Sequence, residues 1–210
     1  MIDAGYFRKR IVTRPKEIDA PQVREVCSVS EHISSGPDDW EESWIHNEFG
    51  WFNSIADATR VVPEPDRPAY RLFAYRVAPH VYRGGDCIDL QIPANVRPVP
   101  IPVDFVSLGF DAVSKSDASV LGFECSPLSC NYLASEIPTN EFCLFQSAEA
   151  ASAGAERFSR GGAEPGDYYV IQVLEAPDHM TGSRRPTAAA ADERRSDGLD
   201  ASKPGDAARG

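Results

Sequence analysis

The sequence lacks the features that mark membrane, secreted and nucleic-acid-binding proteins. It contains no run of about 18 consecutive apolar residues, and its first residues lack the basic-then-apolar order of a secretory signal. We therefore expect a cytoplasmic protein with no membrane segment. The 32 acidic residues outnumber the 21 basic ones and give a formal net charge of −11. Nucleic acid is not an expected partner, because affinity for phosphates comes from Lys and Arg.

Motifs of catalysis and metal binding are also scarce. There is no phosphate-binding loop, no G-x-S-x-G elbow, and no H-x-x-x-H or HExxH spacing among the four histidines. Five cysteines are an odd number, which favours reduced thiols over a disulfide framework. Cys125, Cys130 and Cys143 have neither a fourth cysteine nor a nearby histidine to complete a zinc site. We expect neither a metal nor another cofactor.

The composition is that of a globular protein, with 42% hydrophobic and 25% charged residues. The pattern of short apolar segments predicts one α+β domain over residues 1–176, built on a mixed, mostly antiparallel sheet of five to seven strands. From residue 177 the chain consists largely of Ala, Asp, Arg, Gly and Ser. Such a segment buries too little apolar surface to offset its ordering entropy, so 177–210 is predicted to be a disordered tail.

Residues 105–145 contain a repeated phrase that predicts a central β-hairpin. Leu108–Ala112 and Leu121–Cys125 are similar, and a short polar stretch separates them. In the simplest register, Asp111 and Glu124 share the face opposite the apolar side chains. These two carboxylates either perform acid–base or cation chemistry, or form the ordinary solvated face of a sheet.

Capping signals predict three helices. Asp19 with Gln22 favours a helix at about 20–33, an acidic start favours another at 38–47, and Ser147 caps a third at 147–160. Strands are expected at 6–13, 70–77, 87–92, 142–145 and 168–174. The third helix and its two neighbouring strands form a predicted C-terminal β-α-β unit.

An acidic, aromatic segment supports our first functional hypothesis. Eight acidic residues and no Lys or Arg lie between Glu25 and Thr59. The predicted binding residues of this segment are Asp38, Asp39, Trp40, Glu41, Glu42, Trp44 and Trp51. Aromatic anchors carry much of the energy of protein interfaces. We therefore expect a non-enzymatic binding protein of immunity or antitoxin type, whose partner is a basic protein. The alternative is that the tryptophans pack on the sheet and the acids face water.

The second functional hypothesis is a small enzyme that works from residues 105–145. Cys130 precedes a predicted helical turn, where a thiol pKa is lowered, and His46 or His80 is the candidate base. Asp111 and Glu124 are the alternative catalytic pair. The alternative to a nucleophilic role is that Cys130 is a structural loop cysteine.

Overall fold

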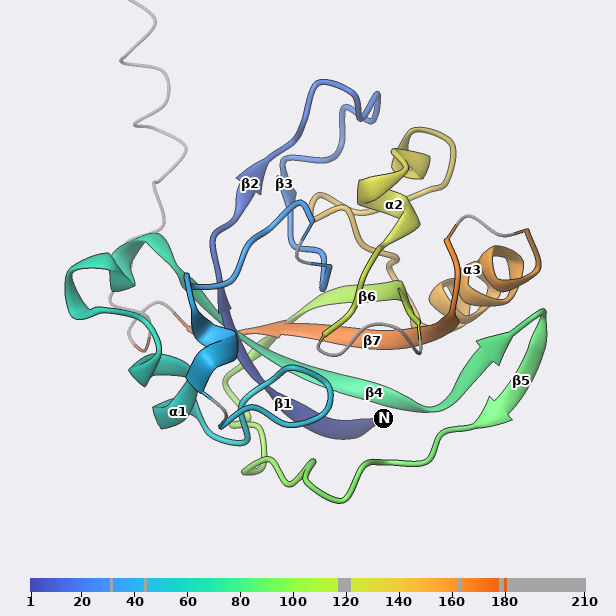
Figure 1. Cartoon of the computed structure of the whole chain (residues 1–210). Coiled ribbons are helices and arrows are strands. Elements are labelled where there is room, and N and C mark those ends of the chain that lie inside the picture. Colours follow the sequence, from blue (N-terminus) through green and yellow to red (C-terminus); the bar gives the residue numbers. More distant parts are fainter. Residues whose placement is uncertain (31, 44, 117–121, 162–163, 178–179, 181–210) are drawn as a thin grey trace, which may run out of the picture.

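An antiparallel sheet of five strands forms the centre of the molecule (Figure 1). The computed structural model describes residues 1–30, 32–43, 45–116, 122–161, 164–177 and 180. The strand order is β1, β4, β7, β6, with β5 paired to the distal part of β4. The strands are β1 (Ile2–Lys9), β4 (Arg71–Arg83), β5 (Asp86–Asp89), β6 (Val106–Lys115) and β7 (Asp167–Glu175). The predicted α+β class is confirmed.

Short helices and a small second sheet surround this centre. The minor strands β2 (Val12–Thr13) and β3 (Glu25–Val26) pair with each other. The α-helices are α1 (Ile55–Arg60), α2 (Pro127–Cys130) and α3 (Ala148–Gly161), and the 3₁₀ helices are η1 (Trp40–Ser43), η2 (Glu64–Ala69) and η3 (Leu133–Ser135). In the part of the chain that the structure describes, no helix combines the length and apolar character needed to cross a membrane.

Both faces of the sheet are covered, as the alternation of side chains along β7 shows. Tyr168 and Val170 belong to one apolar cluster, whereas Ile171 and Val173 belong to the other. The helix α3 covers the first face, where Phe158 packs against Tyr168 with ring centroids 5.8 Å apart. An aromatic cluster from the loops before β4 covers the second face.

The predicted C-terminal β-α-β unit is present only in outline, because its first strand, predicted at 142–145, is reduced to a single bridge at Phe145. Phe145 forms an antiparallel bridge to Phe110 of β6, and Phe110 also pairs antiparallel with Gln172 of β7. The backbone at Phe145 and β7 therefore run in the same direction on opposite sides of β6, joined by α3. This helix begins as predicted, because the Ser147 hydroxyl accepts the N–H of Ala150 at 3.2 Å.

The predicted pairing within residues 108–125 is wrong. The ladder partner of β6 is β7, and the second copy of the repeated phrase meets β6 only at its end. There Ser114 exchanges backbone hydrogen bonds of 2.8 and 2.9 Å with Cys125 and Glu124. Gly122 has φ of 73°, which interrupts an extended strand. The expected turn includes residues 117–121, which lie outside the described residues; the hairpin that the sheet does contain is β4–β5, around Gly84.

The helix predicted at 20–33 is also wrong. Its described residues form turns, loop and the two-residue strand β3, and the N–H groups of Arg24, Glu25 and Cys27 donate to the carbonyls of Glu141 and Phe142. Backbone pairing with a distant segment thus replaces the internal hydrogen bonds of a helix. The helix predicted at 38–47 is reduced to η1.

The predicted tail lies almost entirely outside the described residues, and the domain boundary at 176 stays a prediction.

Candidate thiol site

One helical turn brings two cysteines together. Cys125 precedes α2 and is buried, with 3% of its surface exposed, whereas Cys130 is the last residue of α2 and is half-buried. The N–H of Cys130 donates to the carbonyl of Ser126 at 2.8 Å and closes the turn. The two thiols are thereby held in hydrogen-bonding contact, and both are free.

The Cys125–Cys130 hydrogen bond separates the protonation states of the two thiols. Donation from Cys125, followed by contacts with Ser30, Ser126 and Ser129, lowers the pKa of Cys130 to about 6, against a burial effect that raises it. The same hydrogen bond and burial raise the pKa of Cys125. At neutral pH the sulfur of Cys130 therefore carries a negative charge while Cys125 keeps its proton.

Cys125 is the main donor to this thiolate. The Ser30 hydroxyl has one hydrogen, and its 2.7 Å bond to the Glu124 carbonyl is shorter than its 3.4 Å contact with the Cys130 sulfur. The Cys125 thiol also lies 3.5 Å from Asn131 Oδ1, but a thiolate is a stronger acceptor than a neutral amide. Removing the Cys125 thiol should therefore change the protonation of Cys130 more than removing Ser30 does.

His32 completes the cluster. One of its ring nitrogens and the sulfur atoms of Cys125 and Cys130 all lie within 4.8 Å of one another. The residue is exposed, and its backbone N–H donates to the Ser30 hydroxyl at 3.3 Å. A neutral imidazole at this distance is able to exchange a proton with a group bound at the sulfur, directly or through one water.

A buried lysine fixes the segment that carries Ser30 and His32. Lys9, at the end of β1, is 1% exposed. Its ammonium donates to the carbonyls of Ser28, Val29 and Ser30 at 3.0, 2.8 and 2.7 Å. Three carbonyls satisfy the three donors of the ammonium, which is the arrangement that a buried lysine requires.

A buried carboxylate holds the same segment through its donors. Asp111 is fully buried, and it accepts the Val29 N–H at 2.9 Å and the Ser28 hydroxyl at 3.0 Å. Its other oxygen accepts the Ser126 hydroxyl at 2.6 Å and the Ala112 N–H at 2.9 Å. Burial raises the pKa of Asp111 and these four hydrogen bonds oppose that rise. Asp111 thus connects the 28–30 segment to the start of α2 and positions both halves of the site.

The structure places Asp111, Glu124 and His46 in environments that differ from those predicted from the sequence. Asp111 is not on a solvated face, because both faces of β6 are covered. The Glu124 carboxylate accepts a hydrogen bond from the Ser116 hydroxyl. The ring nitrogens of His46 contact the carbonyls of Asn47 and Glu41 at 3.3 and 3.2 Å, and the ring lies beside Trp40.

The tryptophans that were expected at the surface lie in the core. Trp40 and Trp51 are 5% and 4% exposed. Trp40 packs edge-on against Phe7 at 4.9 Å, and Trp51 packs against Tyr75 at 4.6 Å. Trp44 lies outside the described residues. For Trp40 and Trp51, packing against the sheet is therefore the correct alternative.

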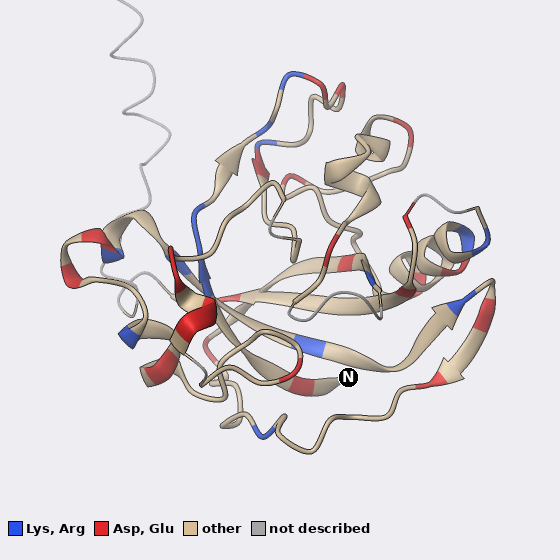
Figure 2. Cartoon of the chain, in the orientation of Figure 1, with Lys and Arg blue, Asp and Glu red and all other residues tan. Residues whose placement is uncertain are grey.

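The four acidic residues of the same segment remain at the surface. Asp38, Asp39, Glu41 and Glu42 are all exposed. Figure 2 shows the ribbon at η1 in the red of acidic residues. This group is an acidic surface without exposed aromatic anchors from Trp40 or Trp51.

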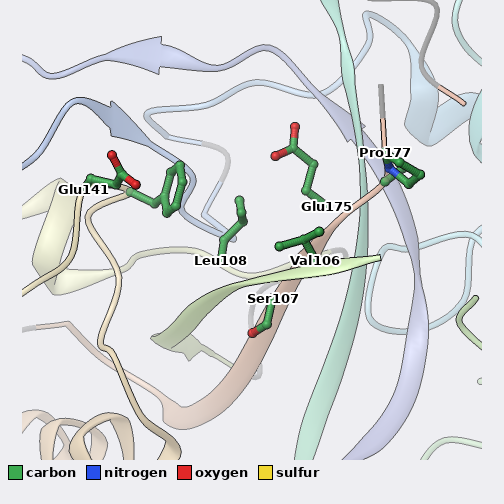
Figure 3. A pocket seen from close by; sticks show the side chains of 8 residues that line it. Val106, Ser107, Leu108, Glu141, Glu175 and Pro177 are labelled. Atoms are coloured by element: carbon green, nitrogen blue, oxygen red, sulfur yellow. The ribbon is translucent and has the colours of Figure 1, made fainter. Parts of the chain in front are cut away.

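A pocket of about 390 Å³ lies near the end of β7 (Figure 3). Its lining residues are Val106, Ser107, Leu108, Glu141, Phe142, Glu175, Ala176 and Pro177. Glu175 is ion-paired with Arg71, which also binds Glu25 at 2.7 Å, and Gln172 donates to the Ser107 hydroxyl at 3.1 Å. The polar groups of this pocket already have partners within the fold, so it offers less chemistry than the thiol site.

Comparisons with known proteins identify no relative. No protein-family model, no curated protein and no solved structure matches the chain.

Proposed function

We propose that this protein is a small enzyme that uses Cys130 as a covalent nucleophile and His32 as its proton-transfer partner. The observation that carries the proposal is the cluster itself, in which a His32 ring nitrogen lies within 4.8 Å of the Cys130 sulfur. Cys130 is also reachable, since it is half-buried and His32 is exposed. The proposal includes a cytoplasmic location, because a free thiolate requires a reducing compartment.

The reaction class that these groups suit best is acyl transfer. The Cys130 sulfur attacks the acyl carbon of an ester or thioester, the bond to the leaving group breaks, and protonated His32 supplies that group with a proton. Neutral His32 then removes a proton from water as it attacks the acyl-sulfur intermediate, which releases the carboxylic acid and regenerates the thiolate. The buried thiol of Cys125 stabilises the Cys130 thiolate before the first step and again when the second step releases it.

A chromogenic ester tests this proposal on the intact chain. We expect p-nitrophenyl acetate to release a burst of one p-nitrophenolate per chain, with the acetyl group on Cys130 identified by mass spectrometry. Cys130→Ser should abolish the burst, and His32→Gln should slow the turnover that follows it. Cys87→Ser is the matched control that should behave as wild type, since Cys87 is exposed on β5. Acetylation spread evenly over several cysteines would refute the proposal.

A second candidate function is binding of a basic protein through the acidic surface. Four exposed carboxylates at Asp38, Asp39, Glu41 and Glu42 favour it, because an acidic surface accelerates encounter with a basic partner. Reversing these four charges should abolish capture of such a partner, whereas Cys130→Ala should leave capture intact. The opposite pattern would exclude this candidate.

A further inference from the structure

We propose that His32, Cys125 and Cys130 bind one divalent transition-metal ion of the zinc class, and that this ion switches the thiol site off. Metal binding itself is independent of the proposed catalysis. Only its inhibitory consequence rests on the proposed function.

The positions of the three ligand atoms fit such an ion after a small movement. Zinc lies about 2.3 Å from cysteine sulfur and about 2.0–2.1 Å from histidine nitrogen, so tetrahedral ligand atoms are about 3.5–3.8 Å apart. In this protein the three candidate atoms lie within 4.8 Å of one another. His32 is exposed, so its side chain has room to rotate toward the two sulfur atoms.

The chemistry of the ligands selects the class of metal. Two thiolates and one imidazole are typical ligands of zinc and its neighbours, whereas calcium and magnesium prefer oxygen. Two thiolates also neutralise a divalent ion within a partly buried site. Cys125 and Cys130 have four residues between them, which is the close spacing of paired zinc ligands. The missing histidine comes from residue 32, which no local sequence pattern connects to the two cysteines.

The surroundings hold the ligands in place before an ion arrives. Lys9 binds three successive carbonyls of the segment that leads to His32, and Asp111 connects that segment to Ser126 at the start of α2. Three protein ligands leave a tetrahedral ion one position for water, and His32 at the edge of the cluster is exposed. Three protein ligands with an open position describe a site that an ion enters and leaves, in contrast to a closed structural site.

Binding has a direct consequence for the nucleophile. The sulfur lone pair of Cys130 that would attack a substrate would be donated to the metal. Metal-free and metal-bound forms are thus two states of one site, and only in the first is the Cys130 sulfur free to attack.

Titration of the intact, chelator-treated protein with Co²⁺ and then Zn²⁺ tests metal binding. We expect one Co²⁺ per chain with thiolate-to-cobalt charge-transfer absorption, displaced by one Zn²⁺. Cys125→Ser, Cys130→Ser and His32→Gln should each weaken Zn²⁺ binding at least about 10-fold, measured by competition with a chromophoric chelator. Cys87→Ser should bind as wild type does. The exposed position of His32 makes His32→Gln the variant least prone to unfolding.

The outcomes separate the two proposals. Absence of the charge-transfer absorption, or wild-type affinity in both His32→Gln and Cys125→Ser, overturns the metal site whatever the esterase assay shows. A one-to-one Zn²⁺ complex without an acylation burst in the metal-free protein supports the metal site and refutes the proposed catalysis. If both hold, one equivalent of Zn²⁺ should suppress the burst; a full burst from the Zn²⁺ complex overturns the switch.

Discussion

Alkylation of Cys130 should have an unusual dependence on pH. With a pKa of about 6, half of the Cys130 thiol is ionised at pH 6. An unperturbed cysteine with a pKa of about 8.5 is about 0.3% ionised there, so Cys130 has about 160 times more thiolate. A thiolate of lower pKa is also less nucleophilic, by about 10- to 18-fold over this pKa difference. Cys130 should therefore react about 10 times faster than an ordinary cysteine at pH 6 and about 3 times slower at pH 8.

The assay is iodoacetamide labelling of the native, chelator-treated protein from pH 5 to 9, with each cysteine followed by peptide mass spectrometry. Cys125→Ala removes the largest cause of the low pKa. A hydrogen bond to a charged group contributes about 1.5–3 kcal/mol, so the midpoint for Cys130 should rise by about one to two pH units. Cys87→Ser serves as the control and should leave that midpoint in place. A wild-type midpoint above 8, or an unchanged midpoint in Cys125→Ala, would refute the assignment of charge within the pair.

Two substitutions, each with a matched control, test the fold through the free energy of unfolding, measured by urea denaturation. Asp111→Asn places an NH₂ group opposite a buried backbone N–H and should destabilise the fold by about 2–4 kcal/mol, whereas Glu124→Gln should change it by less than about 0.5 kcal/mol. Equal effects of the two would contradict the role of the buried carboxylate. Gly154→Ala should cost about 1–2 kcal/mol despite the better helix propensity of alanine, because the added Cβ would lie 2.5 Å from the Phe145 ring. Gly161→Ala, with no atom within 4 Å, should be neutral, and a neutral Gly154→Ala would show that the ring moves without cost.

Elements with strong local signals could be predicted from the sequence. Ser147 and the small residues after it specify α3, and the runs of apolar and aromatic residues in β4 and β7 specify the two central strands. The segment 20–33 has an equally good capping signal at Asp19, yet its described residues form no helix. Its backbone N–H groups bond to the 141–142 segment, and a local pattern contains no information about such a distant partner.

The candidate thiol site could be predicted only in part from the sequence, for the same reason. Cys130 was singled out because a helical turn was predicted to begin after it, but in the structure it ends α2, and the first cause of its lowered pKa is Cys125. Its candidate role stays a prediction. His32 was missed because it is distant in sequence from both cysteines and forms no motif with them. Lys9 was missed because lysine is almost never fully buried, so nothing in the sequence distinguishes it from a surface residue.

The assembly of the site from segments that are distant in the sequence makes Cys130 a natural reporter of folding. Lys9, Ser30, Asp111 and Cys130 meet only after β1 and β6 have taken their places in the sheet. In an unfolded chain every thiol has a pKa near about 8.5 and is almost inert at pH 5.5. A short pulse of label at that pH should therefore count native molecules. If the pulse is applied at successive times during refolding, the labelling of Cys130 should report the rate at which the long-range contacts form. Their formation is the slow step expected of such a topology.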